Sequence, residues 1–477
     1  MSPVIERMSS LDAVFLAIED ARNPMNIGSV GIFDGPMPAV DEVFTLVGRR
    51  VAAVTRCRQR VREPRGPVGR PVWVDDTGFD LVHHVRHVRL TAPEVGQLDT
   101  LVAQLMTVPL DRNRALWQIW VVDGLPHEQW AIIALAHHCV ADGIAGSDLL
   151  SAILMDRPDA DGAAPAEPTP PRAAPPTATP STLHVLWFGV RAAMRSAAAR
   201  LRGAVDVLVH PHRSWIRARN VVIAARRLWL QPHHRVTSLV GTIGTARTWT
   251  HLAVPMEQVK TIKASIDCTI NDVVLAAVAS GFRDLLRERG EPVEGRTITA
   301  MVPVSLRSAT EHGDVGNRVA NVHAPLPIGV LDPRAALQAM HAALDDLKGS
   351  HEIEATGLLL RIGDYVPRFV ADRVSRAVLR RQRDVETVIT NVPGPRESLH
   401  LGPHRMVEGY PVAPIGGRVR LTVAVWSYSD QLTVGITGDA DSVPDIDVLR
   451  RGISRGFRAL VEAARSTDDT RSHALDN

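Results

Sequence analysis

Two adjacent histidines end an apolar run in the first third of the chain. His137 and His138 follow the residues WAIIALA, and Asp142 and Gly143 come shortly after them. An imidazole titrates near neutral pH, so a histidine at the end of a strand can act as a base in an adjoining cleft. Gly143 would let a substrate approach the backbone, and Asp142 could orient His138 or pair with an arginine. The pattern indicates general-base chemistry.

Other interpretations of these histidines stay open on the sequence alone. They could be hydrogen-bonded core residues. A metal site is disfavoured, because neighbouring strand residues point to opposite faces and rarely share one ion. A thiol nucleophile at Cys139 is disfavoured too, because the thiol must meet its base side chain to side chain. A second run, HHVRH at 83–87, lacks the Asp-Gly pair and is expected to be a strand with exposed polar positions.

Strands and helices must position these residues. The run WAIIALAHHCV predicts a buried strand, with a helix after it in GSDLLSAILM. Further along, the sequence predicts a strand over 297–306, two strands with a turn near Asp430 over 421–439, and a helix that begins near Thr269 and ends at Gly290. A last helix is expected from about 444 to 465. The mixture indicates two α/β units.

The middle of the chain differs in composition from both flanks. Residues 157–182 are mostly Pro, Ala and Thr, which predicts an extended linker. From 181 to 235 there are ten arginines and one aspartate, a net charge of +9, interspersed with aromatic and aliphatic residues. This pattern predicts helices that face either water or an anionic membrane surface. The candidate membrane-surface residues are Trp187, Arg191, Arg195, Trp215, Arg226, Arg227 and Trp229.

Bulk properties narrow the classes of function. The net charge of the 477 residues is only +2, which gives no sign of nucleic-acid binding. Cys57, Cys139 and Cys268 show no metal-ligand spacing and are expected to be reduced thiols in a cytoplasmic protein. The N-terminal stretch does not have the pattern of a signal peptide. No apolar run approaches the roughly 20 residues that span a bilayer. We therefore expect a protein that is soluble or bound peripherally to a membrane or lipid body.

The segment HHCVADG resembles the HHxxxDG motif of the acyl-CoA-dependent acyltransferases, which include chloramphenicol acetyltransferase and the peptide-synthetase condensation domains. The rest of the chain is similar to bacterial wax ester synthase/diacylglycerol acyltransferases from about residue 8 to 465, except around 157–235. The motifs that carry this resemblance are MSSLDAVFLAIED, NPMNIGSVGIFDG, RALW, TINDVVLA, MVPVSLR with GNR, TNVPGP and GYPVAPIGG. One departure is Ala115, where the family usually has proline.

The resemblance implies an α/β fold of two chloramphenicol-acetyltransferase-like subdomains with mixed sheets and an active-site tunnel between them. The expected division is an N-terminal subdomain 1–156, the linker 157–182, a basic helical insert 183–238, a C-terminal subdomain 239–466 and a disordered tail 467–477. The resemblance also implies acyl transfer from long-chain acyl-CoA to diacylglycerol or a fatty alcohol. No cofactor or metal is expected beyond acyl-CoA as substrate.

The same resemblance assigns roles to individual residues. His138 would be the general base, His137 its helper, and Asp142 a structural ion-pair partner of an arginine, with Arg114, Arg307 and Arg318 as candidates. Candidate cleft residues are Asn271 and Asp272, which helix capping would explain nearly as well, and Ser427 and Tyr428 as weak candidates for the oxyanion donor. Asn391 and Gly394 are expected to form a turn.

Two alternatives to this function remain. One is an HHxxxDG acyltransferase that acts on another lipid or on a polyketide or sugar alcohol. The other is a non-catalytic protein of lipid surfaces that keeps the fold. The intact His138 and Asp142 argue against the second alternative.

Overall fold

The computed structural model describes residues 6–63, 70–91, 96–140, 237–266, 268–305, 319–348, 368–382 and 384–475, together with the single positions 212 and 219. The expected helix after Gly143, the linker 157–182 and nearly all of the basic insert 183–238 lie outside these residues. The seven candidate membrane-surface residues lie outside them as well.

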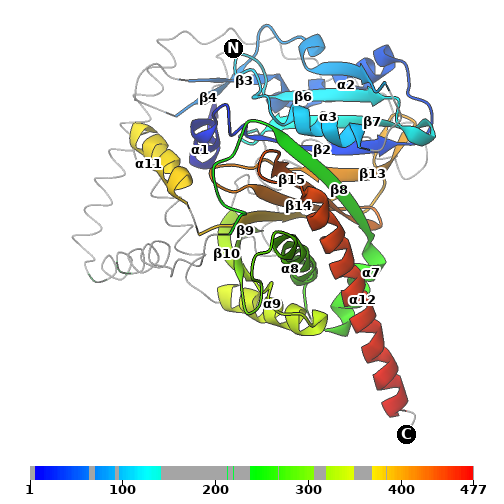
Figure 1. Ribbon diagram of the computed structural model, residues 1–477. Helices are drawn as coiled ribbons and strands as arrows, with labels where there is room; N and C mark the ends of the chain where they lie inside the picture. The colour runs from blue at the N-terminus through cyan, green and yellow to red at the C-terminus, as the bar shows by residue number, and fades with distance from the viewer. Residues whose placement is uncertain are drawn as a thin grey trace.

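The N-terminal part contains a six-stranded mixed sheet in the order β12-β13-β2-β7-β6-β5. Only β5 and β6 pair in parallel. A small sheet, β1-β4-β3, lies beside it (Figure 1). The elements here are β1 (Glu6–Arg7), α1 (Ser10–Ile18), β2 (Asn26–Phe33), α2 (Val40–Ala53), β3 (Gln59–Arg62), β4 (Val72–Asp75), β5 (Val85–Arg89), α3 (Gln97–Leu105), β6 (Trp117–Asp123) and β7 (Trp130–His137).

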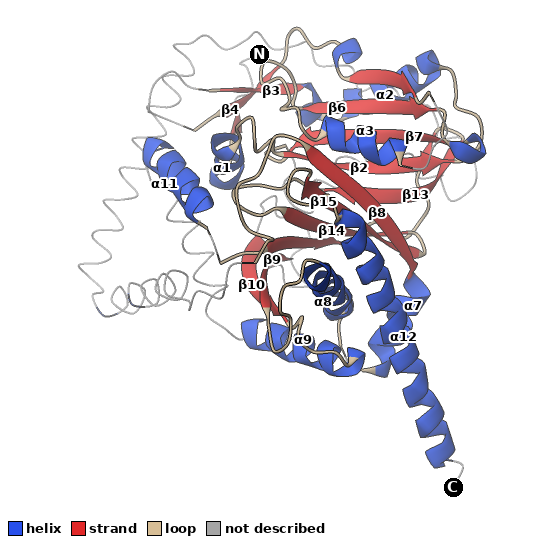
Figure 2. Cartoon of the chain, in the orientation of Figure 1, coloured by secondary structure: helices blue, strands red, loops and turns tan. Residues whose placement is uncertain are grey.

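The C-terminal part contains a second six-stranded sheet in the order β10-β9-β11-β14-β15-β8, in which β11 pairs in parallel with β9 and β14. Helices α8, α9 and α12 cover one face of it (Figure 2). The elements are β8 (Arg247–Pro255), α7 (Met256–Ser265), α8 (Ile270–Glu288), β9 (Ile298–Ser305), β10 (Val319–Leu326), α9 (Pro333–Lys348), α11 (Arg368–Arg381), β11 (Thr387–Val392), β12 (His400–Leu401), β13 (His404–Val412), β14 (Leu421–Tyr428), β15 (Gln431–Asp439) and α12 (Ile446–Leu475).

Local sequence explains the elements that matter most for the site. All eight residues of β7 are buried, as expected for a central strand covered on both faces. Helix α8 starts with a capping box, in which the Thr269 hydroxyl accepts the N–H of Asp272 and the Asp272 carboxylate accepts the N–H of Thr269. The predicted mixed α/β fold is confirmed, and so are the strands over 130–137, 298–305 and 421–439.

The sheets do not follow the expected division of the chain at residue 239. Strands β12 and β13 come late in the sequence, yet β13 pairs antiparallel with β2 in the N-terminal sheet. The side chains of Trp426 and Tyr428, at the end of β14, also pack in the same apolar core as Phe33 and Trp130. The two halves therefore share a strand pair and part of a core.

Two further expectations differ from the structure. Helix α12 continues to Leu475, about ten residues beyond the predicted end, because no glycine or proline interrupts the stretch STDDTRSHAL. In the HHVRH run, the strand begins only at Val85, and His84 is buried rather than exposed. The ring of His84 stacks on both Phe79 and Trp117 in a cluster of three rings, which accounts for its burial.

Candidate active site

His138 lies at the end of β7 in an enclosed position. Its backbone N–H donates to the carbonyl of Met25 at 2.7 Å. Its ring stacks on Phe15 of α1, with 3.8 Å between ring centroids and an interplanar angle of 18°. The Nδ1 atom is buried and has no hydrogen-bond partner among the described residues.

This surrounding sets the protonation state of His138. Burial lowers the pKa of its imidazole from 6.5 to about 4, and the neighbouring His137 adds to the shift. The ring is therefore neutral at pH 7 and has a free lone pair. A neutral imidazole whose proton affinity is limited by desolvation can take a proton from an alcohol and release it again.

His137 is fixed by a buried carboxylate. The side chain is 1% exposed, and its Nε2 lies 3.4 Å from Oε1 of Glu19. Its Nδ1 accepts the backbone N–H of Cys139 at 3.0 Å, which places the ring proton on Nε2, facing Glu19. This arrangement holds the turn between His137 and Cys139 and thereby the backbone that carries His138.

Glu19 connects three parts of the N-terminal half. Its Oε2 accepts two bonds from Arg112, at 2.8 Å from Nη2 and 3.2 Å from Nε, and its Oε1 accepts the N–H of Met25 at 3.1 Å. Burial alone would raise the pKa of this carboxyl. Hydrogen bonds from His137, Arg112 and the N–H of Met25 outweigh burial and lower the pKa to about 2.

Sequence reasoning missed Phe15, Glu19 and Arg112. Phe15 and Glu19 are four residues apart, so they lie one helical turn apart and meet the two consecutive histidines. This spacing is the one sequence signal for the two residues. It can be interpreted only once α1 is known to pack against the end of β7. Nothing local marks Arg112, which is 93 residues from Glu19 in the chain.

Cys139 has the wrong electrostatic surroundings for a nucleophile. Its thiol is 2% exposed. Burial, together with the negative charges of Asp12 and Glu19, raises its pKa well above the ordinary value. The side chain therefore stays a neutral thiol, and it packs as a small apolar group in the core.

Several predicted residues fall where the structure describes nothing. Asp142 and Gly143 lie beyond the last described residue of this segment, and so do Arg307 and Arg318. Arg114 is described, and its Nε lies 3.3 Å from Oδ2 of Asp111. Ala115, at the position of the family proline, is buried next to Leu116 and forms a β-bridge with Arg60.

Ser427 and Tyr428 differ in what their hydroxyls can do. The Tyr428 hydroxyl accepts the N–H of Leu399 at 2.9 Å and donates to the carbonyl of Met406 at 2.8 Å. It is committed to the protein and unavailable as an oxyanion donor. The Ser427 hydroxyl accepts the N–H of Gly394 at 2.9 Å, which leaves its own proton to donate.

The indole of Trp426 is a further donor that the sequence did not suggest. Its Nε1 is buried with no partner among the described residues. A Cβ on Gly394 would lie 2.2 Å from this nitrogen, so the glycine lets the backbone approach the indole N–H. Trp426 and Tyr428, which flank Ser427, pack in the same core as Cys139 and Val140. The end of β14 and the segment that carries His138 therefore contribute to one apolar core.

Asn271 and Asp272 occupy the first turn of α8. Oδ1 of Asn271 accepts a long bond, 3.4 Å, from Nδ2 of Asn391 at the end of β11. Asp272 is fully buried, and its Oδ2 holds the N–H of Thr269 and Nδ1 of His341, both at 2.8 Å. Helix capping accounts for the bond to Thr269, and the bond to His341 ties α8 to α9. Among the described residues, neither side chain has a hydrogen bond or ion pair with His138.

Comparison with known proteins decides the family. Residues 8–274 match the family model described as the wax ester synthase/diacylglycerol acyltransferase catalytic domain, and residues 315–461 match the WS/DGAT C-terminal domain. The chain belongs to this family. It is an acyltransferase, and the resemblance to this family that its motifs indicate is confirmed.

Relatives and solved structures agree with this assignment. A protein of Mycobacterium bovis and one of Mycobacterium tuberculosis, both named as diacylglycerol O-acyltransferases, are each 33% identical to this chain over 98% of both sequences. The wax ester synthase/diacylglycerol acyltransferase of Marinobacter aquaeolei has the same fold, with a TM-score of 0.67, 21% identity and coverage of 96% of this chain and 99% of that chain. A condensation domain of the calcium-dependent antibiotic synthetase also has this fold, with a TM-score of 0.58, 19% identity and coverage of 97% of both chains.

Proposed function

We propose that this acyltransferase moves a long-chain acyl group from acyl-CoA to the hydroxyl of diacylglycerol, which yields triacylglycerol, and that it can also esterify a fatty alcohol to a wax ester. The observation that carries the proposal is the neutral, enclosed imidazole of His138 at the motif shared with acyl-CoA-dependent acyltransferases. The names of the mycobacterial relatives support diacylglycerol as the acceptor.

In the proposed mechanism His138 is the general base. It accepts the proton of the acceptor hydroxyl as that oxygen attacks the thioester carbonyl, and it then gives the proton to the departing CoA thiolate. The ester C–O bond forms, the C–S bond breaks, and no covalent enzyme intermediate is required. His137 and Glu19 act as positioning residues, because they hold the turn that carries the base.

The oxyanion needs a donor that is already in place. Ser427 and the indole N–H of Trp426 are the candidates in the described part of the chain, since each has a proton to donate near Gly394. The roles of Asp142 and Gly143 in shaping the loop after the base remain part of the proposal, as does a substrate tunnel between the two halves. We also propose a cytoplasmic enzyme that works at a membrane or lipid-body surface.

None of the described helices combines the length and the apolar composition needed to cross a bilayer.

The test is an acyl transfer assay with the purified protein, labelled palmitoyl-CoA and one acceptor at a time. Label in triacylglycerol with dioleoylglycerol as acceptor would support the main proposal, and label in the wax ester with hexadecanol would support the second activity. Release of free CoA with neither product formed would contradict both acceptors.

A further inference from the structure

Helix α11 has an unusual surface. The sequence RFVADRVSRAVLRR carries five arginines and one aspartate, a net charge of +4. Three of the large hydrophobic residues that are most exposed among those described also lie on it: Phe369 is 54% exposed, Val374 55% and Val378 48%. Such side chains are normally covered when they gather on one short element.

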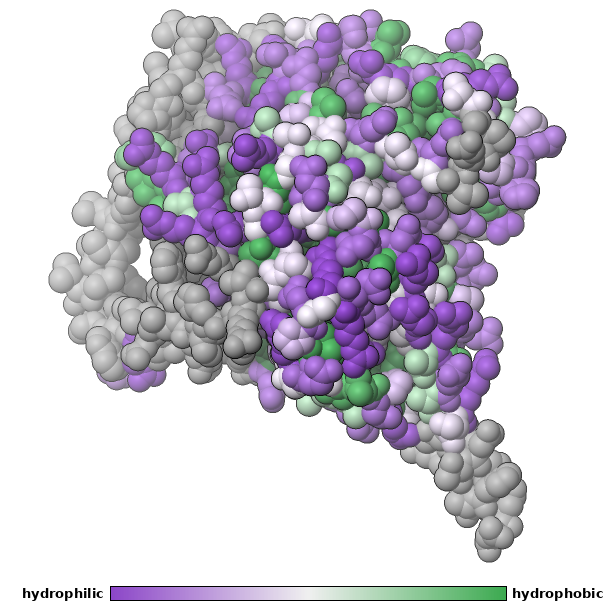
Figure 3. Space-filling view, in the orientation of Figure 1, coloured by the Kyte–Doolittle hydropathy of each residue, from purple (hydrophilic) through white to green (hydrophobic). Residues whose placement is uncertain are grey.

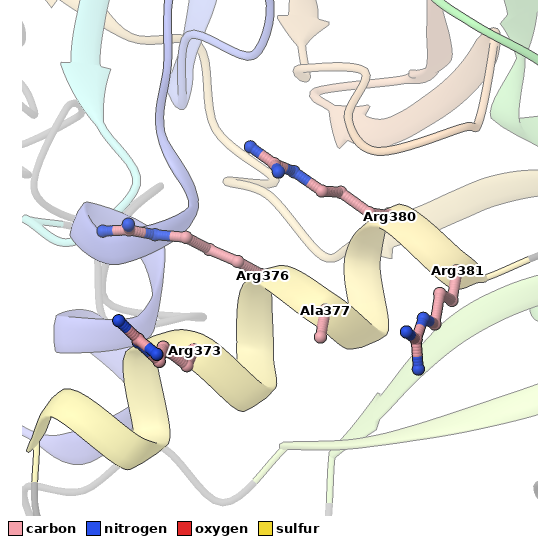
Figure 4. A pocket seen from close by; sticks show the side chains of 5 residues that line it. All are labelled: Arg373, Arg376, Ala377, Arg380 and Arg381. Atoms are coloured by element: carbon pink, nitrogen blue, oxygen red, sulfur yellow. The ribbon is translucent and has the colours of Figure 1, made fainter.

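Three arginines of α11 and its two exposed valines lie on adjoining strips, and Phe369 falls at the N-terminal end of the arginine strip. At about 100° per residue, Arg373, Arg376 and Arg380 fall on one strip of the helix, and Val374 and Val378 lie on the strip next to it. Arg373, Arg376, Ala377, Arg380 and Arg381 line a hollow of about 360 Å³ (Figure 4). In Figure 3 hydrophobic and hydrophilic side chains lie side by side over the position of α11.

The position of α11 links this surface to the active site. The helix packs against α1, and Nε of Arg376 donates to the carbonyl of Ala17 at 2.7 Å. Leu379 packs against the loop at Gly417, where a Cβ would lie 2.8 Å from its Cδ1. Phe15, on the same helix as Ala17, stacks on His138. One helix therefore separates the surface of α11 from the catalytic histidine.

We propose that α11 docks the enzyme on an anionic phospholipid surface, with its arginines on the headgroup phosphates and Phe369, Val374 and Val378 among the acyl chains. Clustered cations beside exposed apolar side chains are the features of a helix that lies in a membrane interface. Each arginine near such a surface adds to the attraction, and screening by salt weakens it. The idea that docking delivers the lipid acceptor rests on the proposed function.

A phosphate-bearing small molecule fits the same residues less well. The nucleotide of acyl-CoA would use the arginines, but it would leave the exposed valines and Phe369 without a role. A lipid surface uses both sets of residues at once. The two sources of phosphate are separated by the experiment below.

The experiment measures co-sedimentation of the full-length protein with phosphatidylcholine vesicles, with and without phosphatidylglycerol. One variant combines Arg373→Gln, Arg380→Gln and Arg381→Gln, and a second combines Val374→Ser and Val378→Ser. Arg376 is left intact because it bonds to α1. Matched controls remove exposed residues elsewhere: Arg49→Gln with Arg451→Gln and Arg458→Gln, and Val82→Ser with Val108→Ser.

We expect the arginine variant to lose roughly 10- to 100-fold in its partition onto phosphatidylglycerol vesicles. The valine variant should lose binding to both kinds of vesicle, while both controls bind as the wild type does. Thermal unfolding of each variant verifies that it is folded. Equal binding of the α11 variants and their controls would overturn the proposal, and so would a raised KM for palmitoyl-CoA with vesicle binding unchanged.

The readout keeps this inference separate from the proposed function. Vesicle binding is measured without turnover, and His138→Ala should bind vesicles as the wild type does. If the wild type transferred no acyl group but α11 variants still lost vesicle binding, docking would stand and the proposed reaction would fail.

Discussion

At the scale of the residue, the protonation states of His138 and Glu19 follow from their neighbours. Phe15 and the surrounding chain exclude water from one face of His138, so that its pKa falls. Glu19 is buried too, but it has a cation and hydrogen-bond donors around it, so that its pKa also falls. In both cases the structure favours the deprotonated form. For His138 it does so because the cation would be desolvated, and for Glu19 because the anion is stabilised.

The first prediction concerns the pH dependence of catalysis. In the proposed mechanism the neutral imidazole of His138 is the base, and its pKa is about 4, so kcat/KM should stay constant as pH falls from 7.5 to 5.5 and drop only near pH 4. Phe15→Ala should let water reach the ring and move the acidic limb up toward 6.5. The measurement is kcat/KM across pH for both proteins. A wild-type inflection near 6.5 would show a solvated imidazole and contradict the account.

The second prediction concerns stability. The pKa of Glu19 is lowered from 4.5 to about 2, so its contribution is fully present above pH 4.5 and is lost as pH falls toward 2. Glu19→Gln should lower the free energy of unfolding at pH 7 by about 3 kcal/mol and flatten its change between pH 4.5 and 2. Urea unfolding at several pH values measures both effects.

Glu6→Gln is the control for this experiment. Glu6 also pairs with an arginine, Arg56, but its side chain is 56% exposed, and a surface ion pair contributes little. Equal losses in the free energy of unfolding of the two variants would show that burial of Glu19 does not strengthen its contribution to stability.

At the scale of the element, the contact between β13 and β15 joins the two halves. A Cβ on Gly435 in β15 would lie 1.8 Å from the carbonyl oxygen of Pro411 in β13. These strands belong to different sheets, so the glycine allows the backbones of the two halves to touch. A methyl group there cannot be accommodated by rotation of a side chain.

Gly435→Ala should therefore push the sheets apart and lower the free energy of unfolding by about 1–3 kcal/mol. Gly78→Ala is a suitable comparison, because the nearest atom to its Cβ would be 3.8 Å away. Thermal unfolding distinguishes the two variants. Unchanged stability in Gly435→Ala would show that the sheets can separate at this point without cost.

At the scale of the whole molecule, the sequence predicted the parts better than their assembly. Buried runs such as WAIIALA and the capping box at Thr269 are local signals, and β7 and α8 follow from them. The return of β13 to the N-terminal sheet has no local signal, because its pairing with β2 joins residues far apart in the chain. Likewise, His138 is recognised by its motif, whereas Glu19 and Arg112 become neighbours only after folding.

The proposed role of His138 as the base for acyl transfer can be tested by a single comparison of rates. The initial rate of transfer from labelled palmitoyl-CoA to dioleoylglycerol is compared for the wild type, His138→Ala and His87→Ala, the last of which removes an exposed histidine. We expect a rate lower by roughly 10²–10⁴-fold for His138→Ala alone, with the thermal unfolding of all three proteins alike. A folded His138→Ala protein that transfers the acyl group at the wild-type rate would contradict this proposed role.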